Sequence, residues 1–205
     1  MIRLESTMNK YLQVLIAGIK SFYMNDAEAL FSGKPVDERA MVGCIYRYIW
    51  DEIGRAGVEC DIDIEYDRMN GKNGELVRKS IDLSQECGTI TCRERCLALI
   101  ARKAGKKKRW HQMVYSLRPD IIMHKRNSSP GTDNFLVAEF KKIPVSRTDD
   151  EFDRAKIRWN TCECSCLKYE IGVFVQLSKD FAKIEQCSKY GEFSVVEVVR
   201  RKVLI

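Results

Sequence analysis

The stretch from Tyr115 to Lys142 constrains the fold of this chain more than any other part of it. Two apolar runs, centred on Ile122 and Val137, flank a loop of Asn, Ser, Pro, Gly, Thr and Asp residues. Apolar runs separated by turn-forming residues are typical of two strands joined by a hairpin. The sequence therefore predicts a pair of strands here, around which the other elements must be arranged.

Charged residues occur in both strands of this predicted hairpin. Asp120 follows Pro119 on the first strand, and Glu139 and Lys141 stand two residues apart on the second. Since side chains alternate along a strand, Glu139 and Lys141 leave one face and Phe140 leaves the other. Pairing of the strands would bring Asp120 beside them. Two carboxylates and an ammonium group at one point suit a divalent metal ion and a phosphate.

The order of these residues resembles the motif of the PD-(D/E)XK nuclease superfamily. The matching residues are Pro119-Asp120 and, nineteen residues after that Asp, Glu139-Phe140-Lys141. A predicted helix upstream carries Glu38, where that superfamily places an acidic helix residue. As an order of elements the likeness spans about residues 36–177, but as identity it covers only a few residues. It implies an α/β fold of the restriction-endonuclease-like kind, with a mixed central sheet flanked by helices.

The resemblance also implies a role for each matched residue. Asp120 and Glu139 would hold Mg²⁺ or Mn²⁺, with the backbone carbonyl of Phe140 as a further ligand. Glu38 would complete the coordination directly or through water, and Lys141 would orient water and offset charge in the transition state. The four side chains would thus be catalytic. The residues alone leave another interpretation of Glu38 open, because an acid in the first turn of a helix also complements the helix dipole.

The function implied by the resemblance is metal-dependent hydrolysis of phosphodiesters, with the chain as a DNA endonuclease and RNA as the other candidate substrate. Endonucleases that cut both strands often act in pairs, so a homodimer is compatible with this function. Two other interpretations stay open. The same fold can serve as a nucleic-acid-binding or protein-interaction module without turnover, or the motif can be a coincidence in an unrelated α/β protein.

Charge is compatible with a nucleic-acid partner. The 205-residue chain has 35 Lys and Arg against 29 Asp and Glu, a net charge of +6. Part of this excess is concentrated in the run Lys106, Lys107, Lys108 and Arg109. At the rim of a cleft such a run would contact the phosphate backbone of DNA. The alternative is a solvated loop, which is the usual place for a charge run.

The nine cysteines do not point to a disulfide framework. Their number is odd, and the chain is long enough to fold without crosslinks. The two denser groups, Cys162-x-Cys164-x-Cys166 and Cys87-x4-Cys92-x3-Cys96, lack the C-x2-C spacing of common metal sites. We therefore expect thiols in a reducing compartment and no essential metal bound by cysteine.

Periodicity and turn residues predict the remaining elements. We expect an N-terminal helical extension (1–33) packed on the core, and one nuclease-like domain (34–205). Within them the patterns predict helices at 7–23, 35–54, 149–159 and 179–187, a weaker helix at 91–104, and strands at 58–66, 169–177 and 193–205. Asp153 and Lys156 share one face of the third helix, where we expect an exposed ion pair. No apolar run reaches membrane-spanning length, which favours a cytoplasmic protein without membrane contact.

Overall fold

The computed structural model describes residues 8–32, 36–64, 68–70, 76–78, 80–82, 114–116, 118–126, 132–163 and 167–201. The helices are α1 (Lys10–Asn25), α2 (Ala27–Ser32), α3 (Glu38–Ala56) and α5 (Arg147–Thr161). The strands of the main sheet are β1 (Asp61–Ile64), β6 (Ile121–His124), β7 (Asn134–Lys142), β8 (Ile171–Leu177), β9 (Phe181–Cys187) and β10 (Phe193–Arg200). Two small sheets pair β2 (Arg68–Asn70) with β3 (Leu76–Arg78) and β4 (Ser80–Asp82) with β5 (Val114–Ser116). The basic run at 106–109, the cysteines at 87–96 and the weaker predicted helix lie outside the described residues, as do Cys164 and Cys166.

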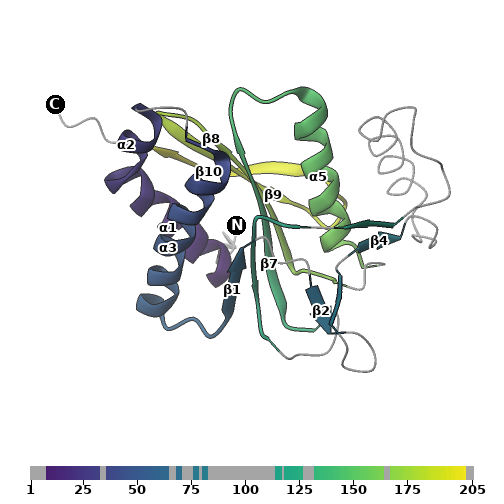
Figure 1. Ribbon diagram of the computed structural model, residues 1–205. Coiled ribbons are helices and arrows are strands. Elements are labelled where there is room, and N and C mark those ends of the chain that lie inside the picture. The colour runs from purple at the N-terminus through teal and green to yellow at the C-terminus, as the bar shows by residue number, and fades with distance from the viewer. Residues whose placement is uncertain are drawn as a thin grey trace, which may run out of the picture.

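The main sheet is the middle of three layers, with helices on both of its faces (Figure 1). The strand order is β1-β6-β7-β8-β9-β10, and only β7 and β8 pair in parallel. Helix α5 connects these two strands, as a parallel pair requires. It covers one face of the sheet, and α1 and α3 cover the other (Figure 1). The prediction of an α/β fold with a mixed sheet flanked by helices is confirmed at this level.

The layer of α1 and α3 follows from its sequence pattern. Apolar residues at helical spacing bury one side of each helix against the sheet. The Asn9 and Asp37 side chains cap the two N-termini, and Gly57 ends α3 in the left-handed region at φ 62°. At the crossing of the two helices, a methyl group on Gly18 would lie 2.8 Å from the backbone of Ile49. The absence of that methyl group lets α1 and α3 approach each other closely.

The predicted central hairpin is confirmed. Strands β6 and β7 pair antiparallel, with Ile121 opposite Ala138, and β7 lies in the middle of the sheet. The predicted alternation is confirmed as well. Phe140 belongs to the core shared with α1 and α3, whereas Glu139 and Lys141 contact α5.

The helix predicted at 179–187 is wrong, because this segment is strand β9. Polar and apolar residues are interspersed in this segment, so its sequence does not clearly indicate a helix or a strand. In the structure the alternation has period two: Ala182 and Ile184 enter the core with α1, and Lys183 and Glu185 lie on the opposite face. Strands β8 and β10 pair with it on both sides, and this long-range pairing outweighs the weak local signal. The strands predicted at 58–66, 169–177 and 193–205 are present as β1, β8 and β10.

No described helix has the length and apolar character needed to cross a membrane.

Candidate functional site

The site lies where β7 runs on beyond its pairing with β6. The ladder between the two strands stops at Ala138, so the last residues of β7 extend past it. Two carboxylates accept hydrogen bonds from backbone N–H groups of this overhang. Asp120 Oδ2 accepts from Phe140 N at 2.7 Å, and Glu38 Oε2 accepts from Lys142 N at 2.9 Å. The start of β6 and the first turn of α3 thus bring a carboxylate each to one edge of β7.

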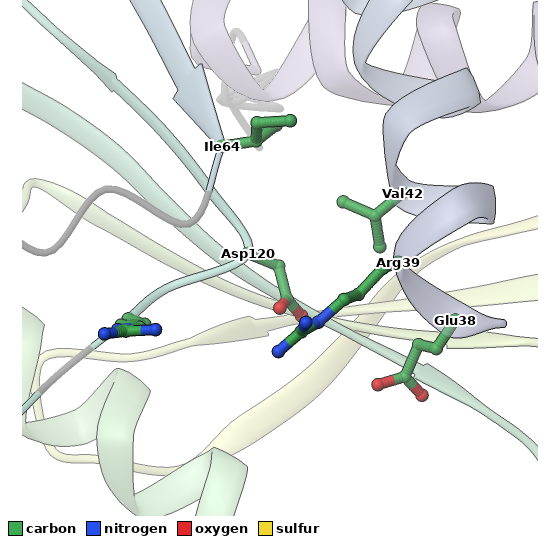
Figure 2. Close-up of a pocket in the computed structure, with 6 residues that line it drawn as sticks. Glu38, Arg39, Val42, Ile64 and Asp120 are labelled. Carbon is green, nitrogen blue, oxygen red and sulfur yellow. The ribbon is translucent and has the colours of Figure 1, made fainter.

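A pocket of about 410 Å³ opens beside these two carboxylates. Its lining consists of Glu38, Arg39, Val42, Ile64, Arg118 and Asp120. Figure 2 shows the Arg39 side chain reaching from α3 toward the carboxylate of Asp120, with Val42 and Ile64 as an apolar wall. The pocket therefore combines negative and positive groups on one accessible surface. The two arginines were not among the residues expected from the sequence.

On the α5 side of β7, two lysines connect three carboxylates. Lys141 Nζ lies 3.0 Å from Glu38 Oε1 and 3.0 Å from Asp153 Oδ2. Lys156 Nζ lies 2.6 Å from Glu139 Oε2 and 2.9 Å from Asp153 Oδ1. Charge thus alternates from α3 through β7 to α5. We call this group with Asp120 the β7 cluster: Glu38, Asp120, Glu139, Lys141, Asp153 and Lys156.

Asp153 and Lys156 form the predicted ion pair, but the prediction that it is exposed is wrong. Their side chains are 5% and 16% exposed, and both face β7. Spacing of three along a helix fits a buried face as well as an exposed one, so spacing could not decide. A usable signal was that Asp153 stands four residues before the apolar Ile157, which is fully buried against β8. Gly172 of β8 allows this close approach, since a methyl group there would lie 2.8 Å from Thr161 Cγ2.

Burial and mutual charge shift the protonation of the cluster. Burial raises the pKa of Asp120 to about 6, although the N–H of Phe140 and the charge of Lys156 act in the opposite direction. Burial also raises the pKa of Glu139 well above its ordinary value, against the charge of Lys156. For Lys141 and Lys156, burial acts to lower the pKa, but the neighbouring carboxylates outweigh it and raise the pKa. Both lysines are therefore fixed positive charges.

The predicted metal ligands fit a hard divalent cation in their chemistry. Glu139 Oε1 is buried and has no hydrogen-bond partner among the described residues, so this oxygen can accept a further contact. The N–H and C=O of one strand residue point to the same side, so the Phe140 carbonyl faces the side of Asp120. Oxygen donors of this kind suit Mg²⁺ or Mn²⁺. The predicted set also included Glu38, but within the described residues no three His, Cys, Asp or Glu side chains are grouped so that they could hold a metal ion.

The described residues include only some of the cysteines and none of the basic run. Cys44 and Cys60 carry free thiols, and burial raises the pKa of Cys60 to about 11. Lys106, Lys107, Lys108 and Arg109 lie outside the described residues, so their contact with DNA stays a prediction.

Comparisons with protein families, curated proteins and solved structures find no match to this chain. The likeness to the PD-(D/E)XK superfamily stays a prediction from Asp120, Glu139 and Lys141.

Proposed function

We propose that this chain is a metal-dependent phosphodiester hydrolase that acts on DNA, with its active site at the β7 cluster. The observation that carries the proposal is the convergence of Asp120, Glu139 and Lys141 at the overhanging end of β7, joined there by Glu38. Glu139 and Lys141 belong to β7, Asp120 precedes β6, and Glu38 begins α3, 103 positions from Lys141 in the sequence. Perturbed carboxyl pKa values beside an accessible pocket are typical of functional sites.

Each group of the cluster has a part in this function. Bound by Asp120, Glu139 and the Phe140 carbonyl, Mg²⁺ or Mn²⁺ would polarise a phosphate oxygen and make water a better nucleophile. Lys141 keeps its proton, so it acts as a fixed charge that orients water and offsets negative charge in the transition state. Glu38 accepts hydrogen bonds from β7 with both oxygens, which positions Lys141, and it would contact the cation directly or through water.

The pocket supports an anionic substrate. Arg39 and Arg118 line it beside the carboxylates. Guanidinium groups bind phosphate oxygens through two parallel hydrogen bonds, so these arginines are suited to hold the phosphodiester next to the cation. The restriction-endonuclease-like fold belongs to this proposal, as do a homodimer and the contact of the 106–109 run with DNA.

A second function is favoured by one observation. The two lysines already pair with three carboxylates of the cluster, so the site is partly neutralised without any metal ion. This arrangement also fits a nucleic-acid-binding module on the same fold that has no turnover. Such a module would bind DNA equally well in EDTA and in Mn²⁺, and would leave it intact.

The test is cleavage of mixed-sequence DNA in Mn²⁺ by the wild-type chain, Asp120→Asn and Lys141→Ala. Asp120→Asn should lower both Mn²⁺ affinity and cleavage, because it removes a charge that holds the cation. Lys141→Ala should retain Mn²⁺ binding and lose about 10²-fold or more in rate. Lys141→Gln serves as the milder variant, and thermal melting verifies that each protein is folded.

Two exposed residues give matched controls. Asp51→Asn and Lys179→Ala make the same chemical changes on the surface and should leave cleavage unchanged. Full cleavage by folded Asp120→Asn protein would contradict the proposed active site. Binding of DNA by the wild-type chain with no cleavage in Mn²⁺ or Mg²⁺ would favour the module without turnover.

A further inference from the structure

Glu139, a proposed ligand of the cation, already has a positive partner within the chain. Lys156 Nζ lies 2.6 Å from Glu139 Oε2, and the side chains are 16% and 2% exposed. The other oxygen, Glu139 Oε1, is buried, and no group in the described part of the chain hydrogen-bonds to it. One oxygen of this carboxylate is thus held by a lysine, and the other is left for a further partner.

The six residues of the β7 cluster include more carboxylates than ammonium groups. The cluster has four carboxylates, Glu38, Asp120, Glu139 and Asp153, and two lysines, Lys141 and Lys156. Burying like charges together is costly unless an opposite charge relieves it. A divalent cation would offset this excess of carboxylates, but it would have to share Glu139 with the ammonium of Lys156.

Asp153 offers the ammonium another position. It stands one turn before Lys156 on α5, and its Oδ1 is already 2.9 Å from Lys156 Nζ. A rotation about the terminal bonds of the lysine side chain would therefore release Glu139 while the contact to Asp153 is kept.

We propose that Lys156 is a resident counter-cation of Glu139 that a divalent metal ion displaces, and that Asp153 retains the displaced ammonium. This inference rests on the proposed function, since it concerns the same cation. Lys156 stabilises the metal-free protein and at the same time competes with the metal ion. It is a positioning residue, because its contacts are to Glu139 and Asp153.

The experiment measures Mn²⁺ affinity of the full chain by titration calorimetry. Lys156→Met keeps the apolar stem of the side chain but removes the competing charge. We expect Mn²⁺ to bind on the order of tenfold more tightly or better, since breaking a buried ion pair leaves an uncompensated carboxylate. The melting temperature of this variant should fall in EDTA and rise on addition of Mn²⁺ by more than that of the wild type.

Arg154→Met is the matched control. Arg154 lies on the same helix and also bridges two carboxylates, Asp150 and Glu185, away from the β7 cluster. It should lose stability equally in EDTA and in Mn²⁺, with unchanged Mn²⁺ affinity. Should Lys156→Met be too unstable to purify, Lys156→Gln tests the same loss of charge with a polar side chain.

Asp153→Asn gives an independent second measurement. It removes the charge that would hold the displaced ammonium, so Mn²⁺ should bind more weakly than to the wild type. Equal or weaker Mn²⁺ binding by folded Lys156→Met, in a wild-type background that binds Mn²⁺ and cleaves DNA, would overturn the role of Lys156 and leave the proposed function intact. Absence of Mn²⁺ binding by the wild-type chain and by every variant would overturn both.

Discussion

Helix α5 contributes residues to two clusters of charged side chains, and the two clusters differ in their ratio of cations to carboxylates. The second, here the β9 cluster, consists of Asp150, Arg154, Lys183 and Glu185. Arg154 Nε lies 2.8 Å from Asp150 Oδ2, and Arg154 Nη2 lies 2.6 Å from Glu185 Oε2. Lys183 Nζ lies 3.1 Å from Glu185 Oε1. Two cations thus meet two carboxylates. The Arg154 guanidinium also packs against Phe174, 4.3 Å from the ring centroid.

The β7 cluster is not balanced in this way, because its six residues are four carboxylates and two lysines. The carboxyl pKa values follow this difference. Burial raises the pKa of Glu139 well above its ordinary value, and the charge of Lys156 does not compensate. Burial acts in the same direction on Glu185, yet hydrogen bonds and charge from Arg154 and Lys183 outweigh it and lower its pKa. A balanced cluster is sufficient to fasten α5 to the sheet. An excess of buried carboxylate costs stability, which favours a functional explanation for the β7 cluster.

The largest effect should come from removing the central cation of the balanced cluster. Arg154→Met leaves Asp150 and Glu185 without their shared partner in a largely buried position. Loss of one member of such a network costs about 3–5 kcal/mol. Chemical denaturation should show this loss in the free energy of unfolding to the same extent in EDTA and in Mn²⁺. A loss that Mn²⁺ reverses would show that the β9 cluster also responds to metal, and the contrast between the clusters would fail.

Neutralising one carboxylate in each cluster should change stability in opposite directions. The pKa of Asp120 is raised to about 6 from 3.8, so the folded protein binds a proton more readily than the unfolded chain. Its charge therefore lowers stability as pH rises from about 4 to about 6, by at most roughly 3 kcal/mol. Measured in EDTA, Asp120→Asn should gain stability over the wild type across this window and keep the gain above it.

Glu185→Gln should behave in the reverse way. The pKa of Glu185 is lowered, so its charge stabilises the folded protein above its unfolded value near 4.5, and this stabilisation is lost as pH falls. The variant should be less stable than the wild type by about 2 kcal/mol at pH 7 and should approach it in acid. Denaturation at several pH values measures both variants. The same sign of change for both at pH 7 would refute the distinction.

The sequence predicts the central hairpin because its signals are local. Turn residues between two apolar runs need no knowledge of the rest of the chain, and strand alternation places Glu139 and Lys141 on one face. The buried run of β8 is predicted for the same reason. Glu38 came from a resemblance, since no local pattern relates it to Lys141, 103 residues away.

The missed features depend on contacts between distant segments. Strand β9 becomes a strand by pairing with β8 and β10, and the ion pairs of Glu185 with Arg154 and Lys183 accommodate its charged face. Asp153 and Lys156 have the same spacing whether α5 turns them to solvent or to β7. The place of Arg39 and Arg118 in the pocket likewise depends on how α3 meets the start of β6.

The smallest effect should come from Lys183, the outer cation of the balanced cluster. Its side chain is 35% exposed, and Arg154 already holds Glu185 from the buried side. Exposed ion pairs contribute about 0.2–1 kcal/mol, and salt screens them. Lys183→Met should therefore lower the free energy of unfolding by less than about 1 kcal/mol. The difference from wild type should shrink at about 0.5 M salt, because salt at this concentration screens surface charges.

A double-mutant cycle with Glu185→Gln makes this last prediction sharper. If Lys183 acts only on Glu185, the coupling energy of the pair should equal most of the small loss caused by Lys183→Met. A loss above about 2 kcal/mol, insensitive to salt, would mean that the β9 cluster needs both of its cations. Lys183 would then contribute to the lowered pKa of Glu185 on the same scale as Arg154, and it could not be counted as an exposed ion pair.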